Sequence, residues 1–70
     1  MRVTLERTVI DHVEGQRVNV YRREDDRYWV LFTPTDPSLA TAANVYERVC
    51  NTRDEAFALC DGRSDDAERA

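Results

Sequence analysis

The chain has 70 residues, close to the smallest size at which one apolar core keeps a domain folded without disulfides or a bound metal. Its fourteen acidic residues outnumber ten basic residues, all of them arginine, and give a net charge of -4. Two cysteines are too few for a disulfide framework, and no apolar run is long enough to cross a bilayer, so we expect no membrane association.

The first two segments of the chain resemble strands joined by a glycine turn. Val3, Leu5 and Val9 alternate with polar residues, and the residues after the turn alternate in the same way. A period of two residues is typical of a sheet. Gly15 between the segments suits a tight turn. A short helix over residues 4–14 is the rival structure for the first segment.

A third strand is predicted for residues 27–33, which are rich in aromatic and branched side chains. Pro34 ends it. The acidic residues 24–26 close the preceding hairpin as a two-residue or a three-residue turn, and these two turns give different pairings. Either way the third strand is apolar on both faces, so one face needs a cover from outside the small chain.

A helix is predicted over residues 37–50. Asp36 suits an N-cap and Pro37 the first helical position, and apolar residues then recur at three- and four-residue spacing. The alternative is a fourth strand over residues 44–50, because Val45, Glu47 and Val49 also alternate.

A second helix is predicted over residues 53–61. Thr52 and Glu55 form a capping box before it, and Gly62 stands where a helix-ending glycine is expected. The sequence therefore predicts an α+β domain over residues 1–62, in which both helices cover one face of a three-stranded antiparallel meander. Residues 63–70 are expected to form a disordered acidic tail.

The uncovered sheet face is the candidate interaction surface. Large aromatic and aliphatic anchors with arginines at the rim are typical of protein interfaces. The predicted interface consists of Tyr21, Arg22, Arg23, Arg27, Trp29 and Leu31. We expect a non-enzymatic protein that forms a homodimer and binds a protein partner through this face.

The same residues suggest a different function, the binding of single-stranded nucleic acid. Aromatic rings stack on bases, and guanidinium groups contact phosphates. The acidic residues 24–26 lie within the same stretch, however, and the whole chain is acidic. Both features oppose binding to phosphates, so nucleic acid ranks behind a protein as the partner.

The residues that carry chemistry form no recognisable catalytic or metal-binding motif. His12 is the only histidine, and its neighbour Asp11 would point to the opposite face of a strand. Cys50 and Cys60 lack the spacing of a zinc site and fall on the apolar faces of the predicted helices. No glycine-rich loop is present to hold a phosphate. We therefore expect no catalytic site, no metal and no cofactor.

The absence of lysine, the small size and the acidic stretch "DGRSDDAERA" resemble small acidic proteins of extremely halophilic archaea. The resemblance is one of composition and implies a habitat, not an activity. Dense carboxylates keep a surface hydrated in a cytoplasm of very high salt. A GC-rich genome would also disfavour lysine. The first ten residues lack the apolar core of a secretory signal, so we expect a cytoplasmic protein.

Overall fold

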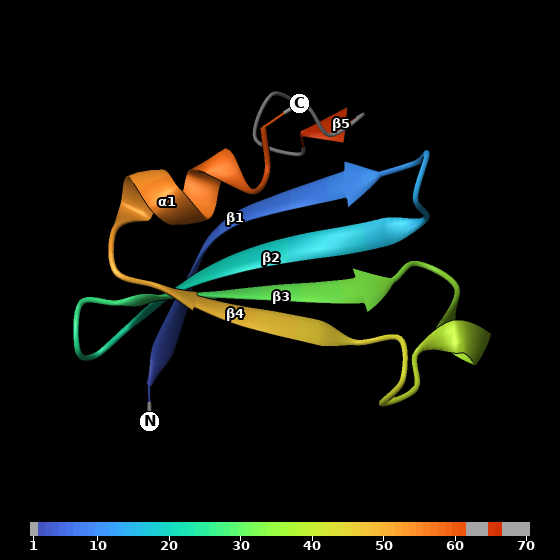
Figure 1. Cartoon of the computed structure of the whole chain (residues 1–70), viewed down its shortest axis with the longest axis horizontal. Helices are drawn as coiled ribbons and strands as arrows, with labels where there is room; N and C mark the ends of the chain where they lie inside the picture. Colours follow the sequence, from blue (N-terminus) through green and yellow to red (C-terminus); the bar gives the residue numbers. More distant parts are fainter. Residues whose placement is uncertain (1, 62–64, 67–70) are drawn as a thin grey trace.

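The structure, a computed structural model, describes residues 2–61 and 65–66. Four strands follow one another as an antiparallel meander (Figure 1). They are β1 (Val3–Asp11), β2 (Gln16–Arg23), β3 (Tyr28–Pro34) and β4 (Tyr46–Cys50). A fifth strand of two residues, β5 (Asp65–Asp66), pairs with β1, so that the order is β4-β3-β2-β1-β5.

The predicted arrangement of three strands and two helices is wrong. The described residues form the four-stranded sheet β1–β4 and a single short α-helix, α1 (Arg53–Ala58). The expected tail, 63–70, lies outside the described residues apart from β5. Within the described part of the chain, no helix has the length and apolar character needed to cross a membrane.

The helix predicted over 37–50 is replaced by a short 3-10 turn and a strand. Asp36 does cap a helical turn, because its carboxylate accepts hydrogen bonds from the Ser38 backbone N–H at 3.0 Å and from the Ser38 hydroxyl at 2.8 Å. That turn, η1 (Pro37–Leu39), ends after three residues. The following residues pair as β4 with the open edge of β3, because pairing satisfies the backbone groups of a strand that is apolar on both faces. The alternative of a fourth strand is therefore correct, although the strand begins at Tyr46 and not at residue 44.

The second predicted helix is present but shorter than expected. It ends at Ala58, and Gly62 lies outside the described residues. The expected cap is formed, since the Glu55 backbone N–H donates to the Thr52 hydroxyl at 3.2 Å. The Glu55 carboxylate reaches back to the Asn51 backbone N–H at 3.3 Å, so both ends of the capping interaction are made.

The two hairpin turns settle questions that the sequence left open. Gly15 has a φ of 67° in the turn between β1 and β2, and the helix over 4–14 is wrong. The next turn is the three-residue form, in which Asp26 takes a φ of 62° and its N–H donates to the Arg23 carbonyl at 3.2 Å. This register places Tyr21 opposite Trp29.

A bulge in β1 changes which side of the sheet the odd-numbered side chains of this strand face. The register shifts between Leu5 and Arg7, where Glu6 is the additional residue. Because the alternation changes there, Leu5 and Val9 point to opposite sides although both occupy odd positions. The apolar side chains of the first half of β1, Val3 and Leu5, therefore lie on the side that α1 does not cover.

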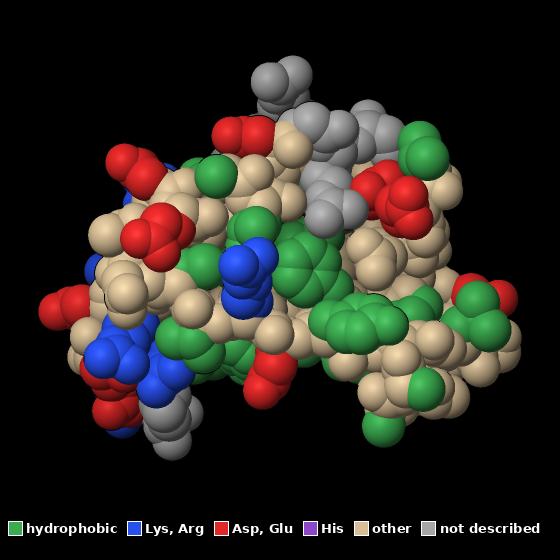
Figure 2. Space-filling view, in the orientation of Figure 1, with side chains coloured by type: hydrophobic (Ala, Val, Ile, Leu, Met, Phe, Trp, Pro, Cys, Tyr) green, Lys and Arg blue, Asp and Glu red, His purple; other side chains and the backbone are tan. Residues whose placement is uncertain are grey.

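The core lies between α1 and one side of the sheet, and its buried side chains are small. Those in the described residues are Val9, Val18, Val20, Val30, Cys50, Ala56 and Cys60. The guanidinium groups of Arg7 and Arg53 lie over the Phe57 ring, 4.9 and 4.5 Å from its centre, and attach the helix to the sheet. Figure 2 shows this side, with hydrophobic side chains still visible beside the short helix.

Candidate interaction surface

The side of the sheet turned away from α1, here called the open face, carries a row of apolar side chains across all four strands. Leu5 lies opposite Tyr21, Tyr21 opposite Trp29, and Trp29 opposite Val49. Side chains in directly opposite positions are close enough to touch. Leu5 and Val49 are exposed, and the two aromatic residues between them are half-buried. These four residues are here called the apolar row.

The centre of the apolar row is an aromatic pair. The rings of Tyr21 and Trp29 lie 5.3 Å apart between centres and are tilted by 32°. The Trp29 indole N–H donates to the Glu47 carboxylate at 3.1 Å, and the Tyr21 hydroxyl accepts from the Asn19 amide at 3.2 Å. Both rings are therefore fixed by a polar contact at the edge and expose part of their apolar faces.

A second, mainly polar row lies next to the apolar row. It runs from Thr8 on β1 through Asn19 and Leu31 to Glu47 on β4. The Thr8 hydroxyl donates to the Asn19 amide oxygen at 3.0 Å, so the amide is held at both of its ends. The open face thus combines an apolar strip with a polar border, as protein interfaces do.

A hollow of about 340 Å³ lies beside the apolar row. Its walls are formed by Val3, Arg23, Trp29, Glu47 and Val49. Arg23 makes an ion pair with Asp25 at 3.0 Å. Its Nε–H is buried and has no hydrogen-bond acceptor within residues 2–61 and 65–66. A buried donor without an acceptor is costly.

The structure brings together four of the six residues that the sequence predicted for the interface. Tyr21, Trp29 and Leu31 share the open face with Arg23. Arg22 lies on the other side of the sheet, since it pairs with Tyr28, a residue that packs against the core.

Arg27 lies at the end of the turn, immediately before the first residue of β3. Its carbonyl accepts a hydrogen bond from the Arg23 N–H at 2.8 Å, and its side chain is exposed. An aromatic platform surrounded by arginines is therefore not formed, because one arginine lies behind the sheet and Arg23 is paired with a carboxylate. This arrangement weakens the case for nucleic acid.

Three residues of the open face were missed by the sequence reasoning. Leu5 and Val3 were assigned to the same side as Val9, and the bulge at Glu6 leaves no clear signal in a strand that alternates throughout. Val49 was assigned to a helix. Its alternation with Glu47 was the signal that could have placed it on the surface.

The residues considered for catalysis or metal binding are one exposed histidine and two cysteines of the core. His12 is exposed in the turn after β1. Cys50 lies on β4, not on a helix, and Cys60 follows α1; both are buried free thiols. Burial raises the pKa of the Cys50 thiol, and the nearby Glu55 carboxylate adds to the rise. Among the described residues, no three His, Cys, Asp or Glu side chains form a group that could hold a metal ion.

The chain matches no family model, no curated protein and no solved structure. The interpretation of the open face therefore depends on its own geometry.

Proposed function

We propose that the protein is a small non-enzymatic protein that forms a homodimer through the open face of its sheet. The observation that carries the proposal is the apolar row, which crosses all four strands of the meander on the side without a helix. Contiguous apolar side chains on a sheet face are costly to leave in water, and they mark interaction sites in soluble proteins.

The small core supports a need for further apolar burial. The buried apolar residues described above are no larger than valine, whereas Leu5 and Val49 remain exposed. Domains of this size gain little stability from one core. A second copy placed on the open face would bury the apolar row of both copies and form a second core between the two sheets.

The charges near the apolar row suit a two-fold symmetric contact. Each copy offers the Arg23 guanidinium, which is paired with Asp25, and an exposed Glu47 carboxylate, and both residues line the same hollow. In a symmetric dimer the arginine of one copy can face the carboxylate of the other, and the same pair then forms twice.

The size of the face is sufficient for a stable contact. The molecule extends over 32 × 28 × 17 Å, with the sheet spread across its two longer dimensions (Figure 1). A standard interface buries about 800 Å² on each partner, which fits within a face of these dimensions. Because such a contact is largely apolar, we expect the dimer to tighten as the concentration of KCl rises.

The composition supports a cytoplasm of high salt as the setting. The acidic, lysine-free chain is suited to molar KCl, where screening reduces the repulsion between two copies of net charge -4. In that setting phosphate contacts are weakened and apolar contacts are strengthened, so the choice of a protein over nucleic acid as the partner agrees with the proposed habitat.

Two matched substitutions test the proposal. Leu5 is 54% exposed on the open face and Leu39 is 52% exposed in η1, so Leu5→Glu and Leu39→Glu add the same charge at equally exposed leucines. Solution mass is measured by light scattering across a series of KCl concentrations. We expect the parent and Leu39→Glu to be dimers at high salt and Leu5→Glu to remain monomeric, with circular dichroism confirming that both variants are folded.

Two results would contradict the proposal. One is a parent protein that stays monomeric at every concentration of protein and salt. The other is a dimer that both glutamate variants weaken to the same extent, since this would point to charge alone. If the parent is monomeric but binds single-stranded oligonucleotides in a salt-sensitive manner, the nucleic-acid alternative takes its place.

A further inference from the structure

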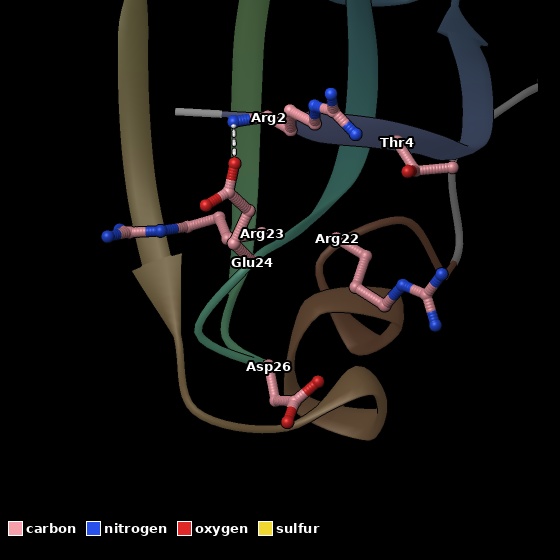
Figure 3. Close-up of a pocket in the computed structure, with 6 residues that line it drawn as sticks. All are labelled: Arg2, Thr4, Arg22, Arg23, Glu24 and Asp26. Atoms are coloured by element: carbon pink, nitrogen blue, oxygen red, sulfur yellow. Dashed lines mark hydrogen bonds between the residues drawn. The ribbon is translucent and has the colours of Figure 1, made fainter.

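A second hollow lies at the tip of the β2–β3 hairpin, where β1 begins. Its volume is about 370 Å³, and it is lined by Arg2, Thr4, Arg22, Arg23, Glu24 and Asp26 (Figure 3). Thr4 pairs with Arg22 on the helix side of the sheet, whereas the apolar row lies on the other side, and Arg23 at the sheet edge lines both hollows.

Three of the lining side chains belong to one surface. Thr4 and Arg22 are directly opposite each other on β1 and β2, and Arg2 lies two residues before Thr4 and so on the same side. Figure 3 shows the guanidinium groups of Arg2 and Arg22 on the side of Thr4, whereas Arg23 points away from them. Two cationic groups and a hydroxyl therefore line the hollow from the same side of the sheet.

The nearby carboxylates do not neutralise these two arginines. Glu24 accepts a hydrogen bond from the Arg2 backbone N–H at 2.6 Å, and Asp25 pairs with Arg23. Asp26 borders the hollow at the tip of the hairpin, away from the arginine head groups in Figure 3. Within the described residues, neither the Arg2 nor the Arg22 guanidinium has a hydrogen bond or ion pair.

This pattern is unusual for a chain in which carboxylates outnumber arginines by fourteen to ten. Two like charges on neighbouring strands repel each other, and an anion placed between them removes that repulsion. The planar guanidinium group binds two oxygens of a phosphate at once, and the Thr4 hydroxyl can donate to a third.

We propose that this hollow is a binding site for a phosphate group, held by Arg2, Thr4 and Arg22. The group is inorganic phosphate or the terminal phosphate of a small ester. Because the two arginines are exposed and Asp26 lies nearby, we expect a dissociation constant on the order of millimolar at low salt, which rises as KCl screens the charges. Arg2, Thr4 and Arg22 lie on the other side of the sheet from the apolar row, and Arg23 lines both this hollow and the one beside the apolar row.

The test is a titration with potassium phosphate followed by nuclear magnetic resonance. Amide shifts of the folded protein are recorded at constant ionic strength, with KCl replaced stepwise by phosphate. We expect saturable shifts at Thr4 and Arg22, weakened about tenfold by Arg22→Gln. Arg17→Gln is the matched control, since Arg17 is an exposed residue of the same strand whose partners are Ile10 and Thr33. It should leave binding unchanged.

Two further variants make the result decisive. Asp26→Asn removes the opposing carboxylate at a backbone position that asparagine tolerates, so it should tighten binding two- to threefold. Arg2→Gln should weaken binding as Arg22→Gln does, and it covers the case that Arg22→Gln does not fold. Parallel titrations with glycerol phosphate distinguish a site for esters from one for the free ion.

The proposal is overturned by shifts that grow linearly without saturation, or by equal losses in Arg17→Gln and Arg22→Gln. Either result would show a general response of a charged surface to ions. A saturable response that Asp26→Asn weakens would also contradict it, because the carboxylate would then be a ligand of a bound cation.

Discussion

The indole N–H of Trp29 and the carboxylate of Glu47 are hydrogen-bonded across β3 and β4 at 3.1 Å. Trp29 pairs directly with Val49, so this bond runs diagonally to the next residue on the same face of β4. It fixes the largest side chain of the open face against the edge strand. The polar atom is satisfied while part of the ring remains available for contact.

The Trp29–Glu47 bond leads to a prediction about stability. Glu47→Ala removes the acceptor at a solvent-exposed position, so we expect a loss of about 0.5–1 kcal/mol in the free energy of unfolding. Glu47→Gln keeps an amide oxygen in the same place and should lose less than half of that. Urea unfolding at matched protein concentration measures both. Equal losses would show that the charge of Glu47 matters and the hydrogen bond does not.

A second prediction concerns the small core. Val20 is fully buried between the sheet and α1, whereas Val13 is 84% exposed in the turn after β1. Val20→Ala deletes two buried methyl groups and should lower the free energy of unfolding by about 2 kcal/mol. Val13→Ala makes the same chemical change and should alter it by less than about 0.5 kcal/mol. Thermal unfolding at high KCl compares the two, and similar melting temperatures would mean that the core lies elsewhere.

The first half of the fold could be read from the sequence because its signals are local. Gly15 adopts the positive φ expected of it, and β1, β2 and β3 follow the predicted segments. The turn after β2 was left open because Asp26 is not a glycine, although an aspartate can adopt the left-handed conformation that the three-residue turn requires.

The prediction for the second half of the chain was wrong because local and long-range signals disagree there. The Asp36–Pro37 pair does start a helical turn, but only η1 forms. Residues after it have both a helical and an alternating pattern, and the deciding factor is the unpaired edge of β3, which is distant in sequence. Pairing with β3 thus outweighs the helix-starting signal of Asp36 and Pro37. The same reason explains why Val49 was missed as part of the candidate surface.

The candidate surface was predictable in its centre and not at its ends. Tyr21 and Trp29 share a face in the three-residue register, so the aromatic pair follows once the turn is known. The position of Leu5 on the open face depends on the bulge at Glu6. The added residue there changes which side of the sheet the odd-numbered side chains of β1 face. Arg22 was wrongly assigned to the open face, because regular alternation along β2 places it on the opposite side of the sheet from Tyr21.

The last prediction is a pH dependence that follows from the buried thiol of Cys50. Burial, and to a smaller extent Glu55, raise the pKa of Cys50 in the folded protein above its ordinary value. Below the ordinary pKa the thiol is protonated in both states, so the full stability is present. As the pH rises above it, the unfolded chain loses this proton first. Stability therefore falls until the pH passes the folded pKa.

The measurement is urea unfolding at several pH values between about 7.5 and 10, the range in which an ordinary thiol titrates. Cys50→Ala lowers stability at every pH because it leaves a small cavity, but its decline with pH should be shallower than that of the parent. Val30→Ala is the control, since it also leaves a cavity in the core and retains the thiol. Parallel declines in the parent and Cys50→Ala would mean that Cys50 titrates alike in the folded and unfolded chains.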